Sequence, residues 1–142
     1  MSKGLSSVSK RRQCAAGVCD PERQQGLKAP APEGTHKLVS LKGPGVFVAA
    51  QVSKQGGSAG LTFVNLDIDG RNVVSVSFAA AGNWGMTQAN PYGLVLLKSG
   101  TVDTLAVGWP APLRFERELV LSVKVAEPGI VQLLANVIRG GS

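Results

Sequence analysis

The stretch that most constrains the fold is residues 61–78, LTFVNLDIDGRNVVSVSF, in which two runs rich in β-branched and aromatic residues flank Asp69-Gly70. The Asp-Gly dipeptide tolerates the positive φ angles that a two-residue type I′ turn requires, so the stretch predicts a β-hairpin that turns at Asp69 and Gly70. Counting outward from the turn places Phe63 opposite Val76, and successive side chains point to opposite faces of a strand. The predicted core face consists of Leu61, Phe63, Val74, Val76 and Phe78.

The same hairpin contains the opening pattern of a calcium-binding loop. Asn65, Asp67 and Asp69 stand at alternate positions and are followed by Gly70. An EF-hand loop needs a bidentate Glu at its twelfth position, where this chain has Val76. The sequence therefore indicates a hairpin turn here, with no metal site.

From Leu38 onward, short apolar segments alternate with Gly, Pro, Asn and Asp, a spacing typical of β-sandwiches and barrels. The clearest strand signal covers residues 114–125, where apolar and polar residues alternate and Arg117 interrupts the apolar set. Residues 130–138 are apolar on both faces, as suits a central strand or one covered by a partner. We therefore predict an all-β fold, a jelly-roll-like antiparallel β-sandwich in residues 38–142. The eight predicted strands cover residues 37–41, 46–53, 61–68, 71–79, 92–98, 102–107, 114–125 and 130–138.

Residues 1–37 differ from the rest of the chain in charge and in apolar content. They contain three prolines and few bulky apolar residues, and they hold seven Lys/Arg against three Asp/Glu, or +4 of the formal net charge of +6. Such a segment predicts an extended, irregular, basic N-terminal arm that becomes ordered by lying on a partner. The partner-binding residues expected in this arm are Lys3, Lys10, Arg11, Arg12, Arg23, Lys28 and Lys37.

Residues for acid–base or nucleophilic catalysis are scarce. His36 is the single histidine, no motif places two carboxylates together, and no glycine-rich phosphate loop opens a helix. We therefore expect a protein that is not an enzyme and binds no cofactor. Trp84, Tyr92 and Trp109 lie in or near loops, where they are expected to cap the core or form an interface, or alternatively to stack on a sugar.

Cys14 and Cys19 stand five residues apart in the predicted arm. The basic N-terminus is not followed by an apolar segment that could serve as a signal peptide, so synthesis and retention in a cytoplasm are expected, and with them reduced thiols. A disulfide is sterically feasible. A zinc site would need ligands beyond the two thiols and His36, so it would have to be shared between chains.

The basic, proline-containing arm, followed by about eight short strands and Gly-rich hairpins such as residues 55–60, resembles small phage capsid cement or decoration proteins. It is similar in particular to the jelly-roll cement proteins of the Bordetella phage type, over nearly the full chain. The resemblance implies a structural virion protein, made in the host cytoplasm, that binds across neighbouring major capsid protein subunits. It also implies self-association, with a dimer favoured and a trimer as the alternative.

Two other functions follow from the residues themselves. A glycan-binding or receptor-binding β-sandwich of a virion would use the loop aromatics to stack on sugar. A nucleic-acid-binding packaging protein would use the basic arm, but the predicted strands lack the interleaved basic and aromatic residues that single-strand binders use, so a nucleic acid partner is disfavoured. No membrane partner is expected, because the longest apolar runs have strand length.

Overall fold

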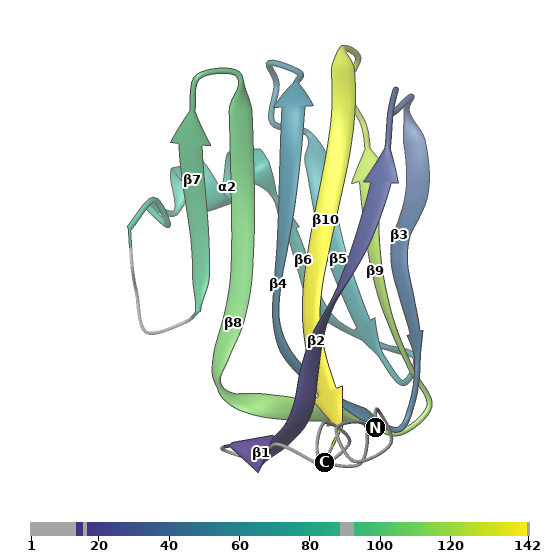
Figure 1. Cartoon of the computed structure of the whole chain (residues 1–142). Coiled ribbons are helices and arrows are strands. Elements are labelled where there is room, and N and C mark those ends of the chain that lie inside the picture. The colour runs from purple at the N-terminus through teal and green to yellow at the C-terminus, as the bar shows by residue number, and fades with distance from the viewer. Residues whose placement is uncertain (1–13, 16, 89–92, 142) are drawn as a thin grey trace, which may run out of the picture.

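The computed structural model of the chain describes residues 14–15, 17–88 and 93–141, and it is a sandwich of two antiparallel sheets (Figure 1). The all-β prediction is confirmed. The six-stranded sheet has the order β1 (Cys14–Ala15), β2 (Val18–Lys28), β10 (Ile130–Gly141), β4 (Gly45–Gly56), β8 (Val102–Phe115) and β7 (Leu94–Ser99). The four-stranded sheet has the order β3 (Gly34–Lys42), β9 (Glu118–Val125), β5 (Thr62–Ile68) and β6 (Arg71–Ser77).

The hydrophobic core fills the space between the two sheets. Every second residue of the facing strands points into it, because side chains alternate along a strand. On the four-stranded side, β9 contributes four buried apolar residues, and on the six-stranded side β10 contributes three at alternate positions in addition to Ile130. These residues are Leu119, Leu121, Val123 and Val125 of β9, and Leu133, Ala135 and Val137 of β10.

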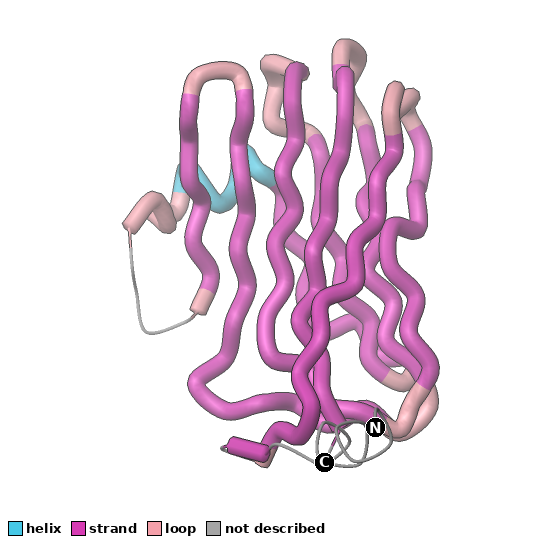
Figure 2. The backbone as a smooth tube through the Cα atoms, viewed as in Figure 1, coloured by secondary structure: helices cyan, strands magenta, loops and turns pink. Residues whose placement is uncertain are grey.

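A short helix, α2 (Phe78–Asn83), connects the two sheets after β6 (Figure 2). The hydroxyl oxygen of Ser77 accepts a hydrogen bond from the backbone N–H of Ala80 at 3.0 Å, which caps the first turn. Phe78 and Ala81 are buried, so the helix closes one side of the core.

The predicted hairpin forms, but with a different register. Asp69 and Gly70 have φ angles of 51° and 82°, and Ile68 pairs with Arg71 across the turn. The register then shifts between Leu66 and Asp67, because Val73 is an extra residue in β6, so Phe63 pairs with Ser77. The predicted pairing of Phe63 with Val76 is wrong for this reason, since counting from the turn does not reveal a bulge.

The bulge also changes which side of β5 faces the core. The buried residues are Thr62, Val64, Leu66 and Ile68, whereas Leu61 is 44% exposed and Phe63 is only partly buried. The predicted core face is therefore wrong for Leu61 and Phe63. On the other half of the hairpin, Val76 and Phe78 are buried and Val74 packs against the core, as predicted. A one-residue slip exchanges the two faces of a strand, so one bulge accounts for the whole difference.

Each of the eight predicted strand segments overlaps a strand of the structure, with one segment divided in two. Residues 114–125 are not one strand, because the chain reverses at Glu116-Arg117 between β8 and β9. The interruption of the apolar pattern at Arg117 marks this reversal.

The prediction of an irregular arm is wrong for residues 14–15, 18–28 and 34–37, which form strands, whereas residues 29–33 belong to no strand. Val18–Lys28 is a full strand that pairs with β10, and β3 begins at Gly34, ahead of the predicted domain start at residue 38. Only Val18 and Cys19 of β2 are buried, so the strand has almost no apolar pattern for sequence reasoning to detect. Its backbone closely approaches β3 at Gly26, where an added Cβ would lie 1.9 Å from the carbonyl oxygen of Leu38.

Candidate functional site: an uncharged sheet face

The three predicted partner-binding residues that the structure describes do not share one surface. Arg23, Lys28 and Lys37 are exposed, but Arg23 pairs with Ile138 on the outward face of the six-stranded sheet. Lys37 pairs with Ser122 on the outward face of the other sheet. The predicted site residues outside the described part of the chain are Lys3, Lys10, Arg11, Arg12 and Tyr92.

The two predicted tryptophans occupy different kinds of position. Trp84 forms the C-cap of α2 and is 62% exposed. Trp109 belongs to β8, and its side chain is not among those described. A shared aromatic interface therefore stays a prediction.

Four rows of described residues on the outward face of the six-stranded sheet are almost free of charge. Strand pairing aligns these residues in rows that cross the sheet, which lies in front in Figure 1. Ser53 and Thr104 in one row are joined by a hydrogen bond of 2.8 Å between their hydroxyl groups. Arg23 is the only charged residue in the four rows. The rows are Arg23–Ile138–Ala49–Gly108, Gln25–Asn136–Gln51–Ala106–Val95, Leu27–Leu134–Ser53–Thr104–Leu97 and Gln132–Gln55–Val102–Ser99. We call these residues the uncharged face.

Large apolar side chains are exposed on the uncharged face, whereas the opposite sheet carries charge. Leu27 is 61% exposed, Leu97 54% and Ile138 42%. Depletion of charge together with exposed apolar groups is typical of the centre of a protein interface. The charged residues on the outward side of the four-stranded sheet are Lys37, Lys42, Asp67, Glu118 and Lys124.

A shallow hollow of about 230 Å³ lies in the uncharged face. It exists because several of the residues there are small, and Ala49, Ala106 and Gly108 leave a depression between strands β4, β8 and β10. Asn136 and Ile138 complete its lining together with Gln51. The side-chain oxygen of Asn136 is buried and has no hydrogen-bond partner in the described structure, which is unusual for a buried polar atom.

Sequence reasoning did not identify this face. The usable signal was the apolar character of residues 130–138 on both sides, which left a central strand and a partner-covered strand as alternatives. Only the register of the neighbouring strands shows that uncharged residues line up across the sheet.

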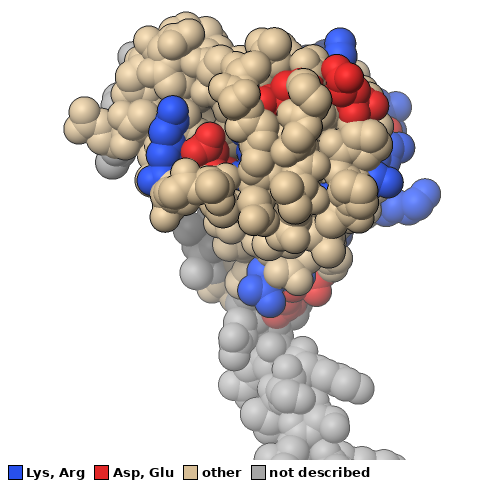
Figure 3. All heavy atoms as spheres, turned by 90° about the horizontal axis from the view of Figure 1, so that it is seen from above, with Lys and Arg blue, Asp and Glu red and all other residues tan. Residues whose placement is uncertain are grey.

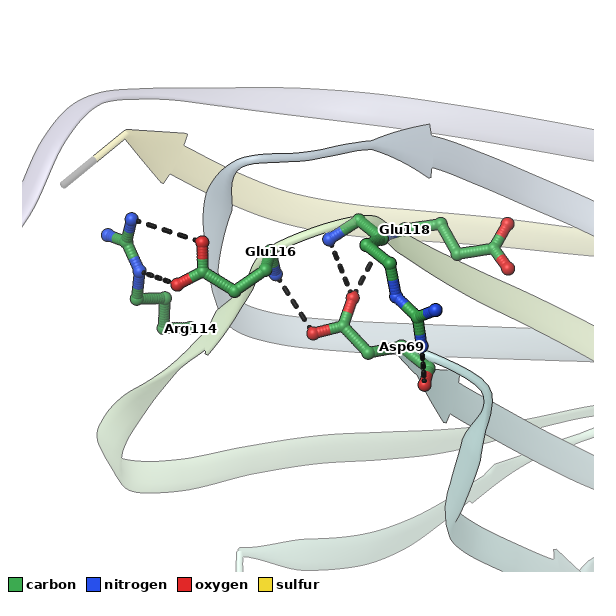
Figure 4. Close-up of polar contacts among 5 residues, drawn as sticks. Asp69, Arg114, Glu116 and Glu118 are labelled. Atoms are coloured by element: carbon green, nitrogen blue, oxygen red, sulfur yellow. Dashed lines mark hydrogen bonds and ion pairs between the residues drawn. The ribbon is translucent and has the colours of Figure 1, made fainter.

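Asp69 is the junction between two hairpins at one end of the sandwich (Figure 4). Its carboxylate accepts hydrogen bonds from the backbone N–H groups of Glu116, Arg117 and Glu118, at 2.9, 2.7 and 3.0 Å. The guanidinium of Arg117 donates to the backbone oxygen of Asp69 at 2.7 Å. These backbone hydrogen bonds lower the pKa of Asp69, because they favour its ionised form. The turn that the sequence predicts at Asp69-Gly70 therefore also stabilises the chain reversal between β8 and β9.

A buried ion pair lies at the other end of the sandwich. The ammonium of Lys54 is 3.6 Å from the carboxylate of Glu127, and both side chains are almost fully buried. Glu127 also accepts hydrogen bonds from the hydroxyl of Thr62 at 2.6 Å and from the backbone N–H of Ala59 at 3.1 Å. Lys54 donates to the carbonyl of Gly56 at 3.2 Å. The charges are thus both paired and hydrogen-bonded, as buried charges require.

A polar hollow of about 450 Å³ adjoins this ion pair. Strand pairing places Lys54, Asp103 and Lys98 in one row, and the rim includes Ser58, Asn83 and Thr87. Seen from above, Figure 3 shows a basic and an acidic group close together at the left of the molecule, while most other charged groups lie toward the right. Lys54, Lys98 and Asp103 line the polar hollow, and Glu127 pairs with Lys54 beside it, so the charges at and next to the hollow sum to zero.

Cys14 and Cys19 form a disulfide, so the expectation of reduced thiols is wrong. The two residues are cross-strand partners in β1 and β2, which brings their Cα atoms to 3.9 Å. Gly17, with a φ of 80°, permits the tight reversal between them.

The described part of the chain contains neither a cluster of metal-binding side chains nor a helix that could cross a membrane. Residues 14–15, 17–88 and 93–141 contain no group of three or more His, Cys, Asp or Glu side chains arranged to hold a metal ion. No helix within these residues is long and apolar enough to span a membrane.

The chain matches no protein-family model and no curated protein sequence. Among solved structures, it is similar to a chain in the acidic stable capsid structure of Helicobacter pylori bacteriophage KHP30. The two chains are 12% identical, the match covers 91% of this chain and 92% of that one, and the TM-score is 0.52. The chain therefore has a capsid-like fold.

Weaker similarities extend to proteins of other kinds. The protein FLHE is 11% identical over 86% of this chain and 98% of its own, with a TM-score of 0.39. A chain of the disulfide-linked pili that form Bacillus endospore appendages is 10% identical over 91% of this chain and 95% of its own, also with a TM-score of 0.39. At these TM-scores neither similarity bears on function.

Proposed function

We propose that the chain is a non-catalytic structural protein of a phage virion, which cements the capsid by binding across neighbouring major capsid protein subunits. The observation that carries the proposal is the uncharged face, and the capsid-like fold supports it. Copies of the chain would also associate with one another, as dimers or alternatively as trimers.

The size of the uncharged face suits such a contact. Strands are spaced about 4.8 Å apart and every second residue advances about 6.7 Å, so the four rows cover roughly 600 Å². A standard protein interface buries about 800 Å² on each partner. One face of this size gives a moderate affinity, and many copies on one shell stabilise the shell collectively.

The test is reassembly of the purified chain with particles of the phage that encodes it, after the chain has been removed from them. Gln51 lies exposed in the middle of the uncharged face, so Gln51→Glu adds one charge without a change in shape. We expect co-sedimentation with particles to weaken at least tenfold, because the contact would bury an unpaired carboxylate.

Asn65→Asp is the matched control, since it adds the same charge on the outward side of the four-stranded sheet. It should bind particles as the unaltered chain does. If Gln51→Glu instead separated copies of the chain and left particle binding intact, the face would be a contact between copies, and the proposed capsid docking would be wrong.

The polar hollow favours a second candidate function, the binding of a saccharide. The zero sum of the charges at and next to it and its closely spaced donors and acceptors suit vicinal hydroxyl groups better than an ion. A glycan array with Asp103→Asn as the variant tests this function, with Asp67→Asn on the other sheet as the control. Binding that is retained by Asp103→Asn, or absent from the unaltered chain, would refute it.

A further inference from the structure

We infer that the disulfide between Cys14 and Cys19 is a redox switch that fastens strand β1 to the sandwich. In a reducing solution the bond opens and β1 separates from β2, and in an oxidising solution the bond closes and holds β1 in place. The chemistry of the switch is independent of the proposed function. Only its timing rests on that function, because a virion protein is made in the reducing cytoplasm of a host and acts in particles released from it.

Strand β1 depends on β2 for its place in the fold. It has two residues, and among the described residues it pairs with β2 alone, through Cys14–Cys19 and Ala15–Val18. Two residue pairs supply few hydrogen bonds to offset the conformational entropy that is lost when this segment is ordered. We therefore expect the covalent bond to be what keeps β1 in place as a strand.

Cys19, by contrast, is held without the help of β1. Its side chain is 7% exposed, and the residue pairs with Gly141 of β10 as well as with Cys14. Gly140 lies so close that an added Cβ would be 2.8 Å from the backbone oxygen of Cys19. Figure 1 shows β1 at the same end of the sandwich as the end of β10. Opening the disulfide therefore releases β1 and leaves β2 paired with β10.

The disulfide is accessible to a dissolved thiol from one side, because Cys14 is exposed whereas Cys19 is buried. A glutathione thiolate attacks Sγ of Cys14, the S–S bond breaks, and the sulfur of Cys19 leaves as a thiolate. A second glutathione thiolate then attacks the glutathione sulfur of the mixed disulfide, which releases glutathione disulfide and the thiolate of Cys14. The protein disulfide thus gains two electrons and two protons while two glutathione molecules are oxidised. Closure by glutathione disulfide is the reverse exchange.

The switch acts on the point at which a strongly basic stretch joins the fold. Residues 1–13 contain four Lys/Arg and no Asp or Glu. When the bond is closed, the fold begins at Cys14, beside β2. When the bond is open, the fold begins at Val18. The redox state therefore sets where this charge is tethered, without a change in the rest of the sandwich.

The experiment follows the full chain in two buffers, one with mostly reduced glutathione and one with mostly glutathione disulfide. Mass spectrometry after alkylation counts the free thiols, and NMR relaxation measures the backbone order parameter of Ala15. We expect both cysteines to be alkylated in the reducing buffer and neither in the oxidising one. On reduction, the order parameter of Ala15 should fall from about 0.85 to below about 0.6, and that of Ala135 in β10 should not change.

The double variant Cys14→Ser/Cys19→Ser is the matched control, and its Ala15 should have the low order parameter in both buffers. The inference is wrong if the disulfide survives the reducing buffer, or if Ala15 keeps its order parameter after reduction. It is also wrong if reduction lowers the order parameter of Ala135, because the bond would then support the whole sandwich. A full redox response in a chain that binds no particles would uphold the switch and count against the cementing function.

Discussion

The buried ion pair of Lys54 and Glu127 provides a demanding test of the fold. Lys54→Met keeps the apolar stem of the lysine and removes its charge, leaving a Glu127 carboxylate whose side chain is 1% exposed. The hydrogen bonds from Thr62 and Ala59 remain, but the counter-charge is lost. Removing one partner of a buried pair lowers the free energy of unfolding by about 3–5 kcal/mol.

That loss converts to a large thermal shift. The entropy of unfolding is about 2.1 cal/mol/K per residue, or roughly 300 cal/mol/K for 142 residues. The melting temperature of Lys54→Met should therefore fall by about 10–17 °C, measured by circular dichroism. Adding Glu127→Gln removes the uncompensated charge and should recover most of the loss, because the amide oxygen still accepts from Ala59.

Lys124→Met is the matched control, since Lys124 is exposed on β9 and its substitution should change stability by less than about 0.5 kcal/mol. The reasoning would be refuted if Lys54→Met melted within a few degrees of Lys124→Met. It would equally be refuted if the double variant lost the sum of the two single losses, since the two charges would then not interact.

Three further predictions concern other parts of the chain. The pKa of Asp69 is lowered in the folded state, so ionised Asp69 stabilises the fold above pH 3.8, its ordinary pKa, and this stabilisation is lost as the pH falls through the lower folded pKa. The urea midpoint of Asp69→Asn should therefore lie below that of the unaltered chain at pH 7. A difference between the two midpoints that is as large at pH 2 as at pH 7 would contradict this. The disulfide closes a loop of six residues, so the double variant Cys14→Ser/Cys19→Ser should lower the free energy of unfolding by at most about 2 kcal/mol. If its melting temperature equalled that of the oxidised chain, the disulfide and β1 would contribute nothing to stability. Deleting residues 1–13 should preserve the melting transition, whereas deleting residues 1–30 removes β2 and exposes β10, so it should cause aggregation in size-exclusion chromatography.

Elements whose signals are local could be predicted from the amino-acid sequence. The Asp69-Gly70 turn follows from the φ angles that this dipeptide tolerates, and β9 follows from its strict alternation. The all-β class follows from short apolar segments separated by turn residues. None of these conclusions requires knowledge of a distant contact.

Features that depend on pairing between distant strands could not be predicted in this way. The bulge at Val73 exchanged the faces of β5, and β2 became a strand because the edge of β10 offers it hydrogen bonds, in spite of its polar sequence. The disulfide arose from the cross-strand register of Cys14 and Cys19. The uncharged face likewise exists only through register, because residues from β2, β10, β4, β8 and β7 form it together. Alternation along one strand shows that its two faces differ, but the neighbouring strands determine what each face contacts.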